Sequence, residues 1–242
     1  MIQGPINLNT ITLAEAIQKS SQVAIAKVAL DLPPDSVFDV LQRSGIGEYV
    51  GTGLPGEVVG MFSNVGAQSR VSRAAMAYGY GFTVTPLQLA AAYVTLAGHG
   101  NRLPLSILKQ DRAPVPERVF DADHAREVVS MMERVTQRGG TATYAGIDDY
   151  RVAGKTGTAR VLGQDGYDDE RHVAWFAGLV PASDPRIVMV VLINEPDSER
   201  TSGGKVAAPI FARVAERSLR LLGVPPDNMA DNGPGLLARR PE

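Results

Sequence analysis

The chain has 242 residues, enough for one large domain or two small ones with a buried core. Its net charge is −2, with 26 acidic and 24 basic residues, so no basic field points to nucleic acid or an anionic membrane surface as a partner. The absence of cysteine excludes disulfides, thiolate metal sites and a cysteine nucleophile. The longest aliphatic run, Ile187 to Ile193, is far shorter than the roughly 20 residues that cross a bilayer.

The first 43 residues are predicted to be helical with two breaks. Thr12 and Glu15 have the spacing of a capping box, which predicts a helix start at Leu13. Ser20 and Ser21 offer the backbone competing hydrogen bonds and therefore favour a break. The predicted helices are 13–19, 22–30 and 35–43.

The middle of the chain is predicted to hold a long loop and two further helices. Residues 45–66 contain seven glycines but also many aliphatic residues, which indicates an ordered loop rather than a linker. Thr85 followed by Pro86 is a strong helix start, and Gly98 predicts the end of that helix. A further helix is expected at 121–136, with Val129 and Met132 among its inward residues.

Three strands and a closing helix are predicted after residue 140. The strands are 150–161, 173–180 and 187–193; the last two are apolar at consecutive positions, which is typical of strands covered on both faces. Asp184-Pro185 predicts a tight turn between them, and hence an antiparallel pair. The final helix, 207–222, is expected to direct the following residues inward: Ile210, Phe211, Val214, Leu221 and Leu222.

This order of elements predicts an α+β fold in which helices precede a meander of strands. Residues 1–224 are interpreted as one domain. Residues 225–242 are rich in glycine, proline and charge, and are predicted to form a disordered tail.

The segment Lys155-Thr156-Gly157-Thr158 lies on the first predicted strand. A lysine and two hydroxyls can hold a carboxylate through charge-assisted hydrogen bonds, and a backbone N–H beside them can stabilise an oxyanion. Gly157 has no side chain, so a substrate could approach the strand closely. The tripeptide K-T-G alone also fits an exposed turn, and the surrounding sequence must decide between the two interpretations.

Several surrounding segments resemble the transpeptidase domain of penicillin-binding proteins. These are 54–57 (LPGE), 78–90 (YGYGFTVTPLQLA), 139–142 (GGTA), 152–154 (VAG), 186–196 (RIVMVVLINEP), 203–209 (GGKVAAP) and 222–228 (LGVPPDN). The last three are most similar to the class B, cell-division subgroup, and the resemblance covers roughly residues 10 to 228. It implies the penicillin-binding protein/serine β-lactamase-like fold, an antiparallel sheet packed by helices beside a helical subdomain, incomplete at its N-terminus.

The resemblance also implies an activity. A serine D,D-transpeptidase of this family cross-links peptidoglycan stem peptides through an acyl-enzyme during septal cell-wall synthesis and is the target of β-lactams. No cofactor is implied. The implied location is the periplasmic face of the inner membrane, through an N-terminal anchor missing from this sequence, with membrane proteins of the division complex as partners.

Residue by residue, the family's Ser-x-Asn element is matched by Ser20-Ser21-Gln22. The resemblance makes Ser20 the proton relay and Lys155 its catalytic partner, with Thr156, Gly157 and Thr158 binding substrate. Gln22 stands where the family has asparagine. It keeps an amide for substrate binding, but one added methylene displaces that amide by roughly an ångström or more, a distance that matters for positioning.

The family's Ser-x-x-Lys nucleophile motif is not found where it is expected, because the nineteen residues before Ser20 contain no serine. Two other matches, 106–109 and 202–205, lie in a predicted strand or loop and in a diglycine link, and neither is predicted to be the nucleophile. The chain alone is therefore expected to form no acyl-enzyme. The alternatives are a non-catalytic substrate-binding or interaction fragment and, disfavoured by the matching segments, a β-lactamase or D,D-carboxypeptidase.

The three histidines, His99, His124 and His172, follow no metal-ligand spacing, and no G-x-S-x-G elbow supports a hydrolase triad. His172 is expected at a boundary between loop and strand. Arg160 and a loop over 162–171 are expected to flank the groove beside Lys155.

Overall fold

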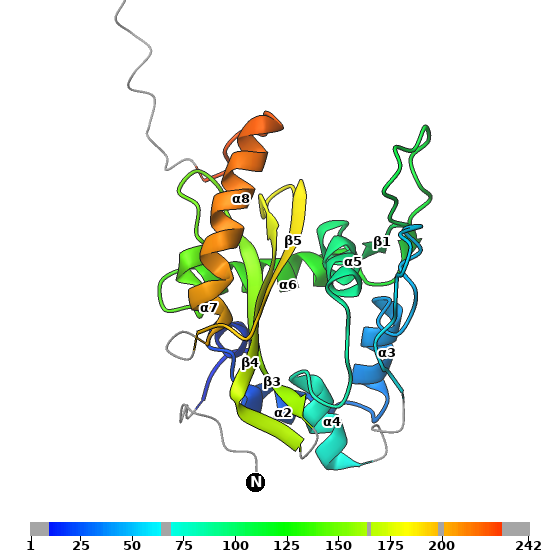
Figure 1. The fold of residues 1–242 in the computed structure, drawn as a ribbon, viewed down its shortest axis with the longest axis vertical. Coiled ribbons are helices and arrows are strands. Elements are labelled where there is room, and N and C mark those ends of the chain that lie inside the picture. Colours follow the sequence, from blue (N-terminus) through cyan, green and yellow to red (C-terminus); the bar gives the residue numbers. More distant parts are fainter. Residues whose placement is uncertain (1–9, 64–68, 164–165, 198–200, 229–242) are drawn as a thin grey trace, which may run out of the picture.

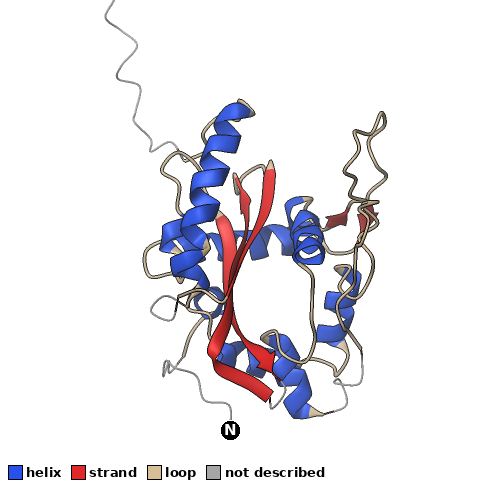
Figure 2. Ribbon diagram, viewed as in Figure 1, coloured by secondary structure: helices blue, strands red, loops and turns tan. Residues whose placement is uncertain are grey.

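The computed structural model describes residues 10–63, 69–163, 166–197 and 201–228. It consists of a three-stranded antiparallel sheet packed by helices and, at one end of it, a region of short helices (Figures 1 and 2). This is the predicted α+β architecture. In the part of the chain that is described, no helix is long and apolar enough to span a bilayer.

The predicted N-terminal helices are confirmed as α1 (Leu13–Gln18), α2 (Gln22–Asp31) and α3 (Ser36–Arg43). The capping box that starts α1 is present, since Glu15 N–H donates to Thr12 Oγ1 at 3.2 Å and Thr12 N–H donates to the Glu15 carboxylate at 2.8 Å. The break between α1 and α2 falls at Ser20 and Ser21, and Ser21 caps α2.

The long glycine-rich segment has no regular secondary structure over 45–63, and side chains hold it in place; 64–66 lie outside the described residues. The Glu57 carboxylate accepts hydrogen bonds from the N–H groups of Val50 at 2.5 Å and Gly51 at 3.0 Å. The buried Gln88 donates to the carbonyl of Glu48 at 2.8 Å, which ties the segment to a helix. These bonds explain how a loop so rich in glycine is ordered.

Two helices were predicted in the middle of the chain and a third was missed. The predicted pair are α5 (Pro86–Ala97), capped by Thr85, and α6 (Ala122–Thr136), in which Val129 and Met132 are buried as expected. The missed helix is α4 (Arg70–Ala77), which is capped by Ser69. It is too short to show a periodic pattern of apolar residues in the sequence. Two short strands, β1 (Asn101–Arg102) and β2 (Glu117–Arg118), pair between α5 and α6.

The sheet has the order β3-β4-β5, formed by β3 (Ala153–Gly163), β4 (Gly166–Val180) and β5 (Ile187–Asn194). The predicted antiparallel pairing of the last two strands is confirmed. Helix α8 (Ala208–Leu221) packs on one face, whereas α5 and α6 cover the other (Figure 1). Because both faces are covered, the middle strand β4 is buried from Phe176 to Val180.

The strand boundaries around the K-T-G segment differ from the prediction. Strand β4 begins at Gly166 rather than at residue 173, so the described residues of the expected loop over 162–171 belong to the paired strands β3 and β4; 164–165 lie outside the described residues. His172 therefore lies within β4, opposite Arg160, and not at a loop boundary. The strand was missed because residues 168–171 are all charged, so the segment shows no apolar alternation.

The inward face of α8 was also predicted wrongly, apart from Phe211. Ala208, Phe211, Ala215 and Leu219 are buried, whereas Ile210, Val214, Leu221 and Leu222 are exposed. The buried positions recur every three or four residues and include two alanines, which let the helix approach the sheet closely. The larger aliphatic residues misled the prediction because size was taken as the sign of burial.

The chain after α8 is bound to the start of β3. Tyr150 Oη donates to the carbonyl of Val224 at 2.7 Å, and the Asp227 carboxylate accepts from Arg151 N–H at 2.7 Å and from Ser183 Oγ at 2.6 Å. Asn228 adds a bond to the carbonyl of Asp149. Ordered contacts thus continue four residues past the predicted domain boundary at 224, and 229–242 lie outside the described residues.

Candidate active site

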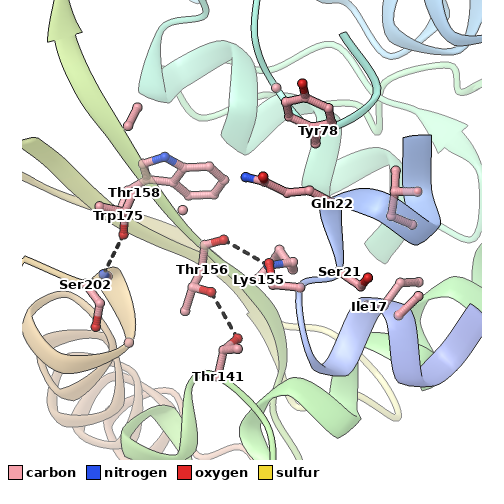
Figure 3. A pocket seen from close by; sticks show the side chains of 18 of the residues that line it. Ile17, Ser21, Gln22, Tyr78, Thr141, Lys155, Thr156, Thr158, Trp175 and Ser202 are labelled. Carbon is pink, nitrogen blue, oxygen red and sulfur yellow. Dashed lines mark hydrogen bonds between the residues drawn. The ribbon is translucent and has the colours of Figure 1, made fainter. Parts of the chain in front are cut away.

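A cavity of about 720 Å³ lies where the α1–α2 junction, the segment after α4, strand β3 and the short helix α7 (Gly203–Val206) meet (Figure 3). It brings together all six residues predicted from the sequence: Ser20, Gln22, Lys155, Thr156, Gly157 and Thr158. Its lining contains one ammonium group and no carboxylate or histidine among the described residues. The cavity is therefore suited to an anionic ligand.

Lys155 and Ser20 meet across 135 residues of sequence. Lys155 Nζ donates to Ser20 Oγ at 2.6 Å and to the carbonyl of Thr156 at 3.0 Å. Burial lowers the pKa of the Lys155 amine to about 8, because the charged form loses its contact with water. With this pKa, roughly a tenth of the amine is uncharged at pH 7 and able to accept a proton from the hydroxyl beside it.

Ser20 occupies an unusual backbone position. It has φ +57°, the left-handed conformation, and α1 ends around it with Ser20 N–H bonded to the carbonyl of Ile17 and Ser21 N–H bonded to that of Ala16. These two bonds form a Schellman motif in which Ser20 takes the position that is usually glycine. The motif turns the chain sharply between two helices and presents the hydroxyl to Lys155.

Gln22 is the first residue of α2, and its side chain reaches across the cavity between Tyr78 and Trp175 (Figure 3). Within the described residues its amide has no hydrogen-bond partner. An exposed amide aimed into a cavity is available to a ligand, as expected for the residue that stands at the family's asparagine position.

The two threonines of β3 are each bonded to a neighbouring segment. Thr156 Oγ1 lies 3.0 Å from Thr141 Oγ1, and Thr158 Oγ1 accepts a hydrogen bond from Gly203 N–H at 3.3 Å (Figure 3). A hydroxyl oxygen that already accepts a bond keeps its own proton free to donate. The contact with Gly203 therefore leaves Thr158 as a donor toward the cavity.

Gly157 pairs with Trp175 across the β3–β4 ladder, and the indole lies against it. A Cβ built at position 157 would come within 1.9 Å of the Trp175 ring. Trp175 thus occupies the side of Gly157 on which a Cβ would lie, so the strand has no room for a side chain at this position, while Gly157 itself lines the cavity.

Sequence reasoning missed Thr141, Trp175 and the pair Gly203-Gly204 as parts of the site. Thr141 and the glycines stood inside segments that carried the resemblance, but which of their atoms face Lys155 depends on packing. Trp175 could have been found by pairing the predicted strands, since its place opposite Gly157 follows from the register alone.

The remaining candidates lie apart from Lys155 or lack a lysine partner. Ser106 is absent from the cavity lining and bonds within its own loop, to the Leu108 backbone and to Gln110. Ser202 does line the cavity, but the lysine three residues on, Lys205, is exposed on α7. His99 forms the left-handed end of α5. No group of three or more potential metal ligands occurs among the described residues.

The fold and the site define a class: an α+β domain with a lysine–serine pair between a helical region and the edge strand of an antiparallel sheet. The family description "Penicillin binding protein transpeptidase domain" matches residues 2–216, and the chain belongs to this family. The class inferred from the sequence is thereby confirmed, and so is the fold.

Relatives and solved structures agree with this assignment. The chain is 43% identical over 218 residues to the peptidoglycan D,D-transpeptidase FtsI of Escherichia coli, covering 90% of this chain and 37% of that protein. It is 38% identical to the probable peptidoglycan D,D-transpeptidase PenA of Neisseria flavescens, covering 92% of this chain and 56% of that one. The transpeptidase domain of penicillin-binding protein 3 from Burkholderia pseudomallei superposes with a TM-score of 0.88 at 36% identity, covering 95% of this chain and 70% of that structure. The chain thus spans little more than a third of the length of the E. coli relative.

Proposed function

We propose that this chain is the C-terminal part of a peptidoglycan D,D-transpeptidase that cross-links stem peptides in septal cell-wall synthesis and is inhibited by β-lactams. The observation that carries the proposal is the Lys155–Ser20 contact of 2.6 Å inside a cavity whose described lining has no acidic group. A stem peptide ends in a carboxylate, and the fused ring system of a penicillin carries a carboxylate as a substituent. Either anion suits a site with one ammonium and several hydroxyls.

In the proposed reaction Ser20 relays a proton, and Lys155 controls whether the Ser20 hydroxyl is protonated. Thr156 and Thr158 hold the carboxylate of the substrate, and Gln22 binds the peptide backbone. Gly157 gives the ladder room for Trp175 against β3. The attacking serine would form an ester with the D-alanine carbonyl and release the terminal D-alanine, and an amine of a second stem peptide would then resolve the ester.

We infer that the attacking serine lies outside these 242 residues. Ser106 is away from the cavity, and Ser202 has no lysine beside it. Removal of a nucleophile of this kind costs orders of magnitude in rate. The chain alone is therefore proposed to be inactive, and the complete protein to act at the periplasmic face of the inner membrane beside other division proteins.

Labelling with a fluorescent penicillin, followed by intact-protein mass spectrometry, tests the position of the nucleophile. We expect no covalent adduct on this chain, with E. coli FtsI as the positive control. A one-to-one adduct would overturn the proposal, and Ser106→Ala and Ser202→Ala variants together with peptide mapping would then name the serine.

The competing hypothesis is a non-catalytic binding or interaction fragment, and it also gives no adduct. Two measurements separate it from the proposal. Non-covalent binding of a peptide ending in D-alanyl-D-alanine, lost in Lys155→Met, supports the substrate site and argues against a fragment that only binds other proteins, whereas absence of that binding argues against the transpeptidase site. A fragment that binds substrate without catalysis would bind the peptide as well, and the second measurement separates it from the enzyme. An upstream coding sequence in frame with Met1 would favour the enzyme, whereas a start codon with its own ribosome-binding site would favour the fragment.

A further inference from the structure

The turn that follows α6, residues 138–141, contacts the active site from two sides. On one side Lys19 Nζ donates to the carbonyl of Gly139 at 2.7 Å, and Gln18 Nε2 donates to that of Arg138 at 3.4 Å. On the other side Thr141 Oγ1 lies 3.0 Å from Thr156 Oγ1. The turn thus joins the end of α1, which presents Ser20, to the strand that carries Lys155.

The turn itself has little freedom to move. Gly140 N–H bonds to the carbonyl of Gln137 and Ala142 N–H to that of Val135, both at 2.9 Å. A Cβ at Gly140 would come within 2.1 Å of the Val135 carbonyl oxygen, so the backbone is packed against the end of α6. The carbonyl of Gly139 is therefore a fixed acceptor for the ammonium of Lys19.

The end of α1, by contrast, needs an external restraint. The helix has six residues, too few to be stable by itself, and it must hold Ser20 at φ +57°. A left-handed residue other than glycine persists only where its surroundings determine it. The bond from Lys19 is made by the residue directly before Ser20, at the point where the turn begins.

We propose that Lys19 is a positioning residue of the active site: its bond to the carbonyl of Gly139 fixes the end of α1, so that the Ser20 hydroxyl faces Lys155. Lys19 is not among the residues that line the cavity, whereas Ser20 is. It therefore acts through Ser20 and not by touching a ligand. The role of Lys19 in catalysis rests on the proposed function. The effect of Lys19 on the position of Ser20 and on the pKa of Lys155 can be tested independently of that function.

The test compares Lys19→Met, which keeps the length and loses the donor, with Lys19→Arg, which keeps a donor. Lys27→Met, on the exposed side of α2, is the matched control. The measurement is the titration of the lysine side-chain NMR signals. The chain has only five lysines, so Lys155 can be assigned with a Lys155→Arg variant.

In the unaltered chain we expect one lysine to titrate near pH 8. In Lys19→Met, loosening of the α1–α2 junction admits water, and the pKa of Lys155 rises toward the ordinary value of about 10.4. Lys19→Arg restores the low pKa, and Lys27→Met leaves it unchanged. A titration of Lys155 in Lys19→Met that matches the unaltered chain would overturn the proposal.

A second variant keeps the proposal testable if Lys19→Met unfolds. Gly139→Ala disturbs the same contact from the opposite side, because Gly139 has φ +84°, a left-handed conformation that strains alanine and so displaces the carbonyl, and because its Cβ would lie 3.3 Å from Lys19 Nζ. It should raise the pKa of Lys155, and the two substitutions together should have less than the summed effect, since both break one contact. Additive effects, or none from Gly139→Ala, would contradict the inference.

Binding of the D-alanyl-D-alanine peptide separates this inference from the proposed function. If Lys19→Met raises the pKa of Lys155 while the unaltered chain binds no peptide, the positioning role of Lys19 is supported and the transpeptidase assignment is contradicted. If the peptide binds through Lys155 but Lys19→Met changes neither titration nor affinity, the assignment stands and positioning fails.

Discussion

Ser20 departs from the local rules of helix endings, and the departure coincides with the candidate catalytic contact. Glycine is the usual residue at the left-handed position of a Schellman motif because any Cβ there is strained. The strain is tolerated at Ser20, where the hydroxyl accepts the bond from Lys155. Local conflicts of this kind are expected at functional sites.

The strain at Ser20 predicts a difference between two substitutions. Ser20→Ala and Ser20→Gly both remove the hydroxyl, but only glycine relieves the left-handed conformation. We expect Ser20→Gly to be more stable than Ser20→Ala by about 1 kcal/mol in urea unfolding. The same pair of changes at Ser130, an exposed position inside α6, should instead favour alanine, because glycine destabilises the interior of a helix. Equal stability of the two Ser20 variants would show that the conformation is not strained.

Lys155 predicts a pH dependence of stability whose sign follows from its lowered pKa. The folded chain releases the proton near pH 8, whereas the unfolded chain keeps it to about pH 10.4. Between these values the unfolded state binds more protons, so the free energy of unfolding rises with pH. Urea titrations from pH 7 to 10 should show this rise, and Lys155→Met should lack it. An equal slope in both proteins would assign the effect to other groups.

The same titration governs the binding of an anionic ligand. Below about pH 8 Lys155 carries the charge that attracts a carboxylate, and above it the charge is lost. Affinity for a peptide ending in D-alanyl-D-alanine is therefore expected to fall as the pH passes through 8. Isothermal titration calorimetry over this range tests the expectation, and an affinity that does not change with pH would exclude Lys155 as the anion contact.

At the scale of elements, the site depends on how closely α7 approaches β3. A Cβ at Gly203 would lie 2.1 Å from the carbonyl oxygen of Trp175 and 2.7 Å from that of Gly157. Both neighbours are backbone atoms, so a side chain at 203 must push the helix away from the strand. That movement would break the bond from Gly203 N–H that orients Thr158.

Gly203→Ala is accordingly expected to lower the free energy of unfolding by about 1–3 kcal/mol and to weaken peptide binding. Gly163→Ala, at the other end of β3, is the control, because its Cβ would meet the nearest atom at an ordinary 3.5 Å. Thermal melts and calorimetry of the two variants decide the matter. If Gly203→Ala behaves like Gly163→Ala, the contact between α7 and β3 does not determine the site.

An element could be predicted when a few consecutive residues in the sequence mark where it begins. The starts of α1 and α5 were found because their signals lie in a few consecutive residues: a capping box at Thr12, and an N-cap threonine followed by proline at Thr85. The β3–β4 arm and the buried face of α8 were not, since the arm has four consecutive charged residues at 168–171 and α8 buries alanine at Ala208 and Ala215. Both errors arose because burial was predicted only from the hydrophobicity and size of the residues.

The site was predictable to a different extent. The pairing of Ser20 with Lys155 came from the resemblance, because nothing local relates residues 135 positions apart. Thr141 and Gly203 were missed although they lie within matched segments, since their contacts depend on the packing of a turn and a helix against β3. Sequence thus indicated the chemistry, and tertiary structure supplied the neighbours that orient it.

At the scale of the whole molecule, both edges of the sheet lack a partner strand within the described residues, and β3, at one edge, lines the cavity. Within the described residues β5 pairs only with β4, and Leu192 on it is 44% exposed. The exposed aliphatic residues of α8 are Ile210, Val214, Leu221 and Leu222. An unpaired strand edge and exposed apolar surface favour association.

We therefore expect the isolated chain to be marginally soluble or to associate as its concentration rises. Size-exclusion chromatography with light scattering over a hundredfold range of concentration measures this. Unfolding by urea at each concentration shows whether association also stabilises the fold. A chain that is monomeric and cooperatively folded at high concentration would contradict the expectation.

The clasp formed by Val224, Asp227 and Asn228 has a practical consequence for anyone shortening or tagging this protein. Its bonds to Tyr150, Arg151 and Asp149 join the last described residues to the entrance of β3, three to five residues before Gly154. A cut placed directly after α8, where the helix ends, would release that entrance along with the tail. A stop codon or a fused reporter placed before Asn228 would remove bonds of this clasp.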